Sequence, residues 1–319
     1  MSDKTDIQIK IKTKTGEITI PESSGLTLKS EENLILPFNF DLGGVNLIYA
    51  TAQILTRVGD EKNPCFIFFV PGKTIAQFSV ERTNVSGISV KSCKAESDNK
   101  RWLISCSGNS EFRISRKTGG GIRILIIDKD LALKSWLINI KGAKYLVFSD
   151  ALLLEGKDSF EFYNSGTNSF NWLLYPKISF KPQLSEGTIS DISKGDPLMS
   201  EFKVELPLVK FEIKTERFGE NKLQLSFPKD LPQGLSNVFI RVNYIGDTGM
   251  SFMNGELVDD QFYYGQPWVL GLKKFYDLPQ HQQMNFYFRP MYRNATYLVD
   301  LKKVSIPDFT REQSFLKVN

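Results

Sequence analysis

The dipeptide Asn254-Gly255 lies within a stretch, Tyr244–Leu272, in which apolar and polar residues are interleaved between glycines. Asparagine followed by glycine is the strongest short signal for a β-hairpin, because a type I′ turn needs a positive φ at both central residues. The dipeptide therefore predicts two paired strands, Met250–Met253 and Glu256–Val258. The large apolar side chains that we expect this hairpin to offer to a core are Phe252, Leu257, Phe262 and Trp268. Such a hairpin either builds a β-sandwich or uses its aromatic rim to hold a ligand.

Short strand-like runs recur along the whole chain, and turn residues separate them. A spacing of roughly 8–12 residues with turn signals between strands is typical of sandwiches and barrels. The polar stretch from Lys181 to Pro197 shows no periodicity and is interrupted by proline and glycine. The pattern predicts an all-β chain with a first sandwich module at 1–170, a linker or boundary region at 171–200 and a second module at 201–319.

Three segments give more specific expectations. Ile7–Ile11 alternates strictly, and with Ile18–Ile20 beyond a short turn it predicts an N-terminal hairpin. Cys65–Val70 is a continuous apolar run that predicts a buried strand. Asp128–Leu137 lacks β-branched residues and predicts one short helix that Asp128 caps. Because no βαβ alternation is visible, we do not expect a doubly wound fold or a TIM barrel.

The composition of the 319 residues is that of a folded soluble protein. The 40 basic and 36 acidic residues leave a formal charge of +4, and they are mixed along the chain. This small excess gives no reason to expect a nucleic-acid partner or a membrane surface. No apolar run approaches the roughly 20 residues of a membrane helix, so we expect no membrane insertion. The polar N-terminus lacks a signal peptide, which leaves a cytoplasmic protein, a fragment or a mature form as the alternatives.

The cysteines and the single histidine limit the chemistry that the chain can support. Three widely spaced cysteines do not form a disulfide framework or a zinc site. Cys65 and Cys106 lie in or beside strand-like runs, where a buried free thiol is favoured over a bridge. The one histidine, His281, lies in a polar stretch that predicts a solvated loop. We therefore expect no metal and no cofactor.

Several short motifs resemble the C-terminal, non-catalytic region of bacterial β-galactosidase-type enzymes of glycoside hydrolase family 35, especially those of gut Bacteroidetes. In the first half the motifs are Leu36-Pro37-Phe38-Asn39, Gly44-Val45, Tyr49-Ala50-Thr51-Ala52-Gln53, Cys65–Val70 with Pro71-Gly72, Asp130-Leu131-Ala132 with Trp136, and Phe148-Ser149-Asp150-Ala151. In the second half they are Gly246-Asp247-Thr248-Gly249, Gly255, Asp259-Asp260-Gln261-Phe262, Gly265 and Trp268-Val269-Leu270-Gly271-Leu272.

This resemblance implies β-sandwich modules of the jelly-roll or galactose-binding-like kind, packed behind a catalytic (β/α)₈ barrel. It also implies a polysaccharide-degrading parent enzyme that works in the periplasm or outside the cell. The barrel itself is absent from this chain, and the two catalytic glutamates of the family sit on that barrel. No catalytic residue can therefore be carried over, and we predict none.

Glycan binding is the chemistry that the side chains could support. A sandwich binds sugars with flat aromatic rings and a few charged or amide groups that read hydroxyls. The candidate carbohydrate-binding residues are Asp247, Asp260, Tyr263, Tyr264, Gln266, Trp268, Tyr292 and Arg293. A structural role is the alternative for several of them: Trp268 as a core residue, Asp247 as a brace that accepts a hydrogen bond from the Gly249 amide, and Arg293 in an ion pair.

Asp259 and Asp260 are the only adjacent acids in the hairpin stretch that could be mistaken for a catalytic pair. Glycoside hydrolysis needs two carboxylates about 5–9 Å apart across one sugar site. Neighbouring residues on a strand point to opposite faces, so these two cannot flank one bond.

The sequence thus favours a non-catalytic accessory region of a carbohydrate-active glycoside hydrolase, with scaffolding and possible glycan binding as its roles. The expected partners are the catalytic barrel domain of a parent hydrolase and an oligosaccharide. Two alternatives remain open. The chain is either itself a polysaccharide-acting enzyme with a site between the two sandwiches, or a structural or adhesion protein.

Overall fold

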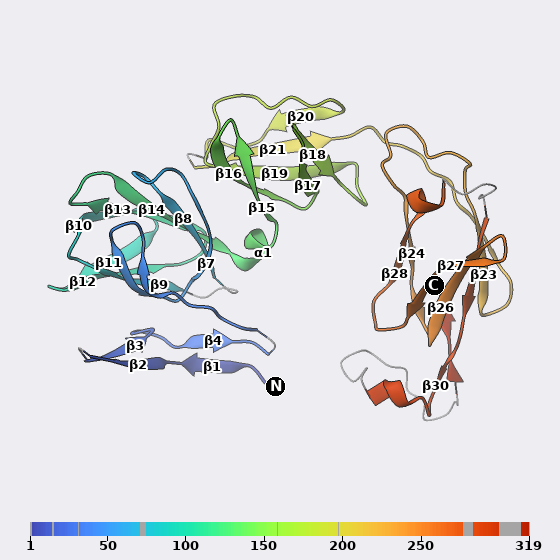
Figure 1. The fold of residues 1–319 in the computed structure, drawn as a ribbon, viewed down its shortest axis with the longest axis horizontal. Coiled ribbons are helices and arrows are strands. Elements are labelled where there is room, and N and C mark those ends of the chain that lie inside the picture. Colours follow the sequence, from blue (N-terminus) through green and yellow to red (C-terminus); the bar gives the residue numbers. More distant parts are fainter. Residues whose placement is uncertain are drawn as a thin grey trace. The chain divides into compact units, whose positions relative to one another are not determined.

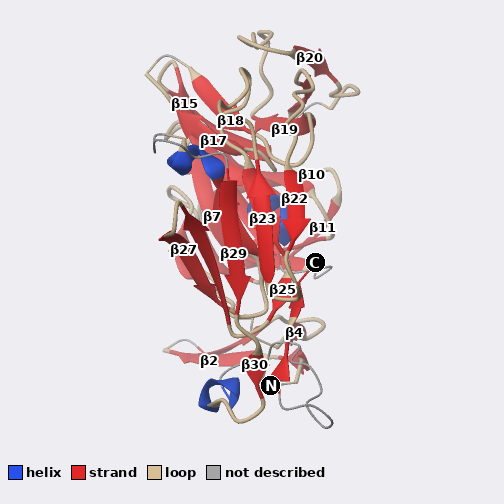
Figure 2. Cartoon of the chain, turned by 90° about the vertical axis from the view of Figure 1, so that its right-hand side faces the viewer, coloured by secondary structure: helices blue, strands red, loops and turns tan. Residues whose placement is uncertain are grey.

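The computed structural model describes residues 2–14, 16–30, 32–70, 75–157, 159–196, 198–276, 283–299 and 314–318. Strands account for 55% of the described residues and helices for 4%, which confirms the predicted all-β class (Figures 1 and 2). Two compact units, Met1–Leu206 and Pro207–Asn319, divide the chain.

Two five-stranded sheets of the first unit share one core and form a sandwich. One sheet has the order β10-β13-β14-β8-β7, from β7 (Gln53–Val58), β8 (Cys65–Val70), β10 (Val85–Val90), β13 (Ser110–Arg116) and β14 (Gly121–Asp128). The other has the order β11-β12-β9-β6-β5, from β5 (Phe38–Asp41), β6 (Asn46–Ala50), β9 (Ala76–Glu81), β11 (Cys93–Ser97) and β12 (Arg101–Cys106). Phe68 of the first sheet and Phe78 of the second meet edge to face, with ring centroids 5.1 Å apart.

Strands β8 and β14 lie parallel to each other and are buried on both faces. Alternate residues of β8, such as Phe66 and Phe68, point into the sandwich core. The residues between them, Cys65 and Ile67, pack on a second cluster that includes Tyr175 of the next sheet. Burial on both faces explains why Cys65–Val70 is apolar throughout, as the sequence predicted.

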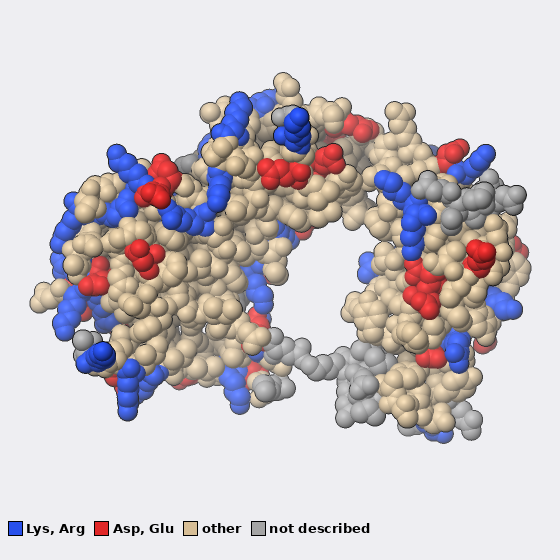
Figure 3. All heavy atoms as spheres, in the orientation of Figure 1, with Lys and Arg blue, Asp and Glu red and all other residues tan. Residues whose placement is uncertain are grey.

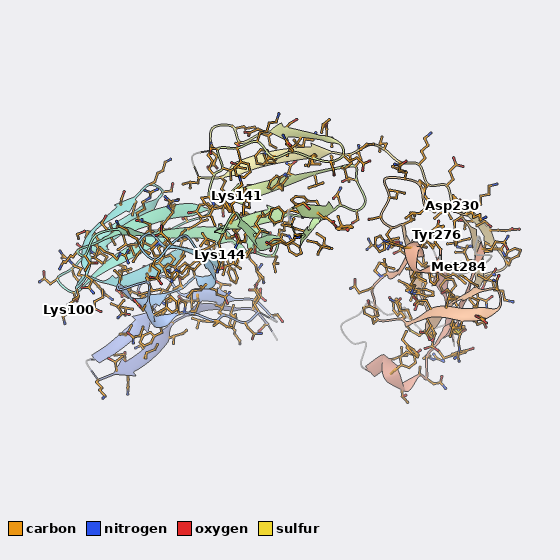
Figure 4. All side chains as sticks on the ribbon, turned by 45° about the horizontal axis from the view of Figure 1, so that its top comes forward. Lys100, Lys141, Lys144, Asp230, Tyr276 and Met284 are labelled. Carbon is orange, nitrogen blue, oxygen red and sulfur yellow. A yellow bond between two sulfur atoms is a disulfide. The ribbon has the colours of Figure 1, made fainter. Side chains whose placement is uncertain are left out.

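A third five-stranded sheet covers the outer face of β8 and β14. Its order is β15-β16-β19-β21-β20, from β15 (Ser135–Ile140), β16 (Ala143–Ser149), β19 (Ser169–Tyr175), β20 (Thr188–Asp191) and β21 (Ser200–Glu205). Lys141 and Lys144, labelled in Figure 4, lie at the turn between β15 and β16. The hairpin of β17 (Leu152–Glu155) and β18 (Phe160–Tyr163) packs on this sheet, with Phe162 5.3 Å from Trp172 between ring centroids.

The unit boundary lies farther along the chain than the linker that we expected at 171–200. β19 crosses the start of that range and pairs with both β16 and β21, so it is central in its sheet. The aperiodic loops around β20 have the composition of a linker, but their ends are held together by pairing of β20 with β21. Composition alone therefore could not separate a long connection within a sheet from a connection between units.

The N-terminal strands form two small pairs, β1 (Lys4–Ile7) with β4 (Leu26–Leu28) and β2 (Ile9–Thr13) with β3 (Gly16–Ile20). The second pair is the predicted hairpin. The loop that follows it is tied to the sandwich, because the Arg101 guanidinium forms an ion pair with Glu22 and the Tyr49 hydroxyl donates to Glu22 at 3.1 Å. A polar network thus joins this segment to β6 and β12.

The second unit is a smaller sandwich. Its main sheet has the order β22-β23-β29-β26-β27, from β22 (Lys214–Arg217), β23 (Lys222–Ser226), β26 (Thr248–Met253), β27 (Glu256–Phe262) and β29 (Gln283–Phe288). Short pairs complete the unit: β24 (Phe239–Val242) with β28 (Trp268–Gly271), β25 (Tyr244–Ile245) with β32 (Lys317–Val318), and β30 (Met291–Tyr292) with β31 (Ser314–Phe315). The described residues of this unit include two 3₁₀ turns, η1 (Leu272–Phe275) and η2 (Thr296–Val299). Met284 of β29, labelled in Figure 4, is fully buried in the core with residues of β24, β28 and β32.

The predicted hairpin at Asn254-Gly255 is present, and both residues have positive φ, 50° and 84°. It joins β26 to β27, with Met253 opposite Glu256. The expectation that Phe252, Leu257 and Phe262 fill the core was wrong. Phe252 is only half-buried and outside the core cluster, while Leu257 and Phe262 are 53% and 71% exposed.

The error arises because successive side chains of a strand point to opposite faces of the sheet. Ser251 and Met253, on the other face of β26, are the residues that point inward. A register shift between Ser251 and Phe252 adds Val258 as an extra residue in β27, so that Leu257 and Asp260 end on the same outer face.

The predicted helix is shorter than expected. Asp128 does cap it, because its carboxylate accepts the Leu131 amide at 2.7 Å. However, α1 covers only Lys129–Ala132, and Ser135–Ile140 forms β15 instead. Pairing with β16 overrides the helical preference of this segment.

The cysteine prediction was right for Cys65 and wrong for Cys106. Cys93 and Cys106 form a disulfide, and their Cα atoms lie 4.4 Å apart as opposite residues of β11 and β12. Cys65 is a buried free thiol. Strand register, which spacing along the sequence does not reveal, brings the first two together.

Basic and acidic side chains are interspersed over the face shown in Figure 3. Within the described ranges, no helix is both long enough and apolar enough to cross a membrane. His281 lies outside the described residues.

Candidate functional site

A pocket of about 220 Å³ opens on the second unit next to the hairpin. We call it the rim pocket. Its lining residues are Asn243, Tyr244, Ile245, Tyr263, Gly265, Gln266, Pro267 and Lys317. Two of them, Tyr263 and Gln266, are among the predicted carbohydrate-binding residues.

Two distant parts of the chain build the rim pocket. Strand β25 pairs with β32, which places Lys317 opposite Ile245. The loop between β27 and β28 supplies the other wall, and it turns at Gly265 with a φ of 87°. A residue with a side chain rarely adopts that φ, so glycine at this position lets the loop fold back over the end of the sandwich.

Two tyrosines support the floor of the rim pocket. The Tyr244 ring is buried and meets the Tyr263 ring edge to face, with centroids 5.7 Å apart. The Tyr244 hydroxyl donates to the Gln261 carbonyl at 2.7 Å, and the Tyr263 amide donates to the Asp247 carbonyl at 2.9 Å. Burial raises the pKa of Tyr263, and a tyrosine hydroxyl is protonated at neutral pH even without such a shift, so it can donate a hydrogen bond.

Trp268 lies in the core rather than on the rim. It is 3% exposed, and its ring packs edge to face on Phe286 at 5.4 Å between centroids. Gly249 makes room for it, because a Cβ at that position would lie 3.0 Å from two ring carbons of Trp268. The structural alternative therefore describes this residue, and its ring face is not available to a sugar.

The Asp247 side chain has structural partners, but they are not the Gly249 amide that we expected. Its carboxylate lies 4.0 Å from the Arg289 guanidinium and is hydrogen-bonded to the Tyr297 hydroxyl. Gly249, whose amide we expected to donate to Asp247, is instead paired with Gln261 of β27. Burial, followed by the bond to Asp247, raises the pKa of Tyr297 to about 12.

The other predicted residues lie outside the rim pocket. Tyr264 belongs to the same loop and is 54% exposed. Asp260 is exposed on the outer face of β27, whereas its neighbour Asp259 is half-buried and forms an ion pair with Lys274. Tyr292 and Arg293 are exposed at the end of β30 and beyond it. The eight residues therefore do not form one site.

Sequence reasoning missed Asn243, Tyr244, Ile245, Pro267 and Lys317 as lining residues. Lys317 is 72 residues from Ile245 along the chain, and only the β25–β32 pairing joins them. No local pattern could have revealed that contact. Tyr244 could have been suspected as a pocket residue, because it begins the interleaved stretch Tyr244–Leu272. However, the alternation of that stretch is explained equally well by an ordinary strand.

The first unit has a more apolar pocket of about 250 Å³ beside α1. Leu55, Phe69 and Ala132 contribute to its lining, and an ion pair between Lys129 and Glu32, 2.7 Å long, lies at its wall. Leu133 also lines it and is 75% exposed.

A cluster of ionisable groups elsewhere in the first unit is held in ion pairs and hydrogen bonds within the fold. Glu111 bridges Arg113 and Arg123 at 3.2 and 3.3 Å. Arg123 in turn donates to the Tyr175 hydroxyl at 3.2 Å, and that hydroxyl lies 3.0 Å from the Cys65 sulfur. Across the described ranges, no group of three or more His, Cys, Asp or Glu side chains is arranged to hold a metal ion.

Comparison with known proteins gives the first unit a context. Residues 1–134 match the family model described as β-galactosidase, domain 2. A probable β-galactosidase B of Penicillium rubens is 23% identical over 164 residues, which is 49% of this chain and 16% of that protein. Similar proteins of Neosartorya fischeri and Aspergillus fumigatus are 24% and 26% identical, each over 156 residues.

These comparisons support a β-galactosidase-like region within the first half of the chain. The chain spans about one sixth of the length of the curated relatives that it matches. The relatives named above are fungal, so the bacterial type that the motifs indicated stays a prediction.

Proposed function

We propose that this chain is a non-catalytic accessory region of a glycoside hydrolase of the β-galactosidase type. The observation that carries the proposal is the match of residues 1–134 to β-galactosidase domain 2. The first unit would serve as a scaffold for the catalytic barrel domain of the parent enzyme. The second unit would hold glycan at the rim pocket, where an aromatic ring, two amide side chains and an ammonium group converge.

A hydrolysis assay tests the non-catalytic half of the proposal. The purified chain should release no more product from a chromogenic β-galactoside than buffer alone does. Release that scales with chain concentration and survives further purification would contradict the proposal and favour the alternative in which the chain is itself an enzyme.

Affinity electrophoresis on gels that contain galactan or another plant polysaccharide tests glycan binding. Gln266→Ala removes an exposed amide of the rim pocket, and it should weaken retardation about tenfold, the loss of one to two hydrogen bonds. Gln283→Ala is the matched control, because Gln283 is an exposed glutamine of the same unit that does not line the pocket. Equal retardation of all three proteins would place the binding elsewhere, and no retardation of the unmodified chain would leave only the scaffold role.

A structural or adhesion role without sugar contact is the second candidate. The burial of Trp268 favours it, since the largest aromatic ring near the rim is committed to packing. The exposure of Tyr264 and the concave lining of the rim pocket favour the first candidate.

We also propose that the parent protein works in the periplasm or outside the cell. The Cys93–Cys106 disulfide supports this location, because such bonds persist in oxidising compartments. Mass spectrometry of the alkylated, unreduced protein from its native host should find the bridge intact in the exported fraction. Recovery of the protein only from the cytoplasm with three free thiols would contradict the location.

A further inference from the structure

The charge of the rim pocket is one-sided. Among the described residues, Lys317 is the one formally charged side chain in its lining, and the other polar side chains there, those of Asn243, Tyr244, Tyr263 and Gln266, are neutral. No carboxylate side chain of a described residue lines the pocket. A ligand therefore meets one ammonium group and several neutral hydrogen-bonding groups.

The structure holds Lys317 in place through its neighbour. Val318 is 8% exposed and belongs to the core of the second unit, and its carbonyl accepts a hydrogen bond from Arg217 at 2.9 Å. Because side chains alternate along a strand, the Lys317 side chain is directed away from the core, and it is exposed on the wall of the pocket.

No nearby acidic side chain of the described residues neutralises the charge of the Lys317 ammonium group. No described residue forms an ion pair with it. Asp247, which influences the ionisation of the neighbouring Tyr244, has its own partners in Arg289 and Tyr297. The ammonium group is thus available to an anionic group of a ligand.

We propose that the rim pocket binds a single sugar unit that carries a carboxylate, a uronic acid, in preference to the matching neutral sugar. The inference rests on the proposed glycan-binding role and specifies its ligand class. The volume of about 220 Å³ is below the range of roughly 300–1,000 Å³ that drug-sized ligands occupy, and it suits one pyranose ring. The Lys317 ammonium would pair with the carboxylate, the Gln266 and Asn243 amides would bond hydroxyls, and the Tyr263 ring would contact the apolar ring face.

Titration calorimetry with two small probes tests the proposal: methyl β-galactopyranoside and the sodium salt of the corresponding methyl galacturonide. Since Lys317 is exposed, we expect the uronide to bind about three- to tenfold more tightly at low salt. The preference should shrink when the ionic strength rises to about 1 M, where charges are screened within about 3 Å. Lys317→Met should abolish the preference and leave the affinity for the neutral sugar within about twofold, the scatter of a neutral surface change.

Lys273→Met is the matched control, because Lys273 is an exposed lysine of the same unit that does not line the pocket. It should keep the preference intact. Circular dichroism checks that both variants fold, and Lys317→Gln replaces Lys317→Met if the first variant does not.

Each outcome separates this inference from the proposed function. Equal affinity for both probes in the unmodified chain would overturn the uronic acid preference while glycan binding stands. A preference that survives Lys317→Met would overturn the role of Lys317. If neither probe binds at about 10 mM, weaker than a free energy of about −3 kcal/mol, the inference fails, and retardation of the chain on polysaccharide gels decides the glycan-binding role separately.

Discussion

At the scale of single residues, burial decides which aromatic side chains serve the fold and which can meet a ligand. Trp268 and Tyr264 lie four positions apart, and both were candidates for sugar stacking. The first is 3% exposed and the second is 54% exposed. Both residues are aromatic, so residue type alone could not tell which of them is buried. Their different exposure comes from the pleat of the strand and from the space that Gly249 leaves beside Trp268.

This difference predicts unequal effects on stability. Trp268→Ala should lower the free energy of unfolding of the second unit by about 3–5 kcal/mol, because it removes a buried ring and leaves a cavity. Tyr264→Ala should change it by less than about 0.5 kcal/mol. Urea unfolding followed by tyrosine fluorescence measures both, and similar losses for the two variants would show that Tyr264 is also packed.

Cys65 gives a prediction about pH. The pKa of the Cys65 thiol is raised to about 12 from an ordinary value of 9.0, and burial is the largest cause of this shift. The folded state therefore holds this proton more tightly than the unfolded state does. The resulting stability is fully present below about pH 9 and is lost as the pH rises toward 12.

Alkylation with iodoacetamide tests the state of this thiol. The native protein should react very slowly at pH 8, since the thiolate is the reactive form. After unfolding without reductant one thiol should react, and after reduction three should react. Rapid labelling of Cys65 in the native protein would contradict its burial.

At the scale of elements, the Cys93–Cys106 bridge ties an edge strand to its neighbour. In the part of the chain that the structure describes, β11 is at the edge of its sheet and pairs only with β12. Apart from the bridge, its residues are exposed or half-buried, so side-chain burial alone holds this strand weakly.

Removal of the bridge should therefore be costly. The double variant Cys93→Ser, Cys106→Ser should lower the free energy of unfolding of the first unit by about 3 kcal/mol, the chain-entropy value for a loop of this length. The control is reduction of the unmodified chain, which should give the same loss in denaturant unfolding. No difference between oxidised and reduced protein would mean that the strand pairs equally well without the bridge.

At the scale of the whole molecule, the division at 206/207 makes a prediction about folding fragments. A chain of residues 1–206 keeps the third sheet complete, whereas a chain of residues 1–170 loses most of β19 and all of β21. Because β19 is the central strand, the shorter chain exposes the apolar face of β16 and the surface beneath it.

We expect the fragment 1–206 to unfold in one cooperative transition, and we expect the fragment 1–170 to aggregate or to lack fixed tertiary structure. Near-ultraviolet circular dichroism and thermal unfolding distinguish these outcomes. A cooperative fragment 1–170 would place the unit boundary at the end of the first module that the sequence predicted, within the third sheet.

The sequence by itself determined the elements that depend on neighbours along the chain. The hairpin at Asn254-Gly255, the N-terminal hairpin, the buried run Cys65–Val70 and the cap at Asp128 all follow from local turn chemistry or periodicity. Only the tertiary structure decided which face of a strand is buried, which cysteines meet and which residues line the rim pocket. A change of one position in register moves every side chain to the opposite face of a sheet, and pairing such as that of Ile245 with Lys317 joins residues that no local pattern relates.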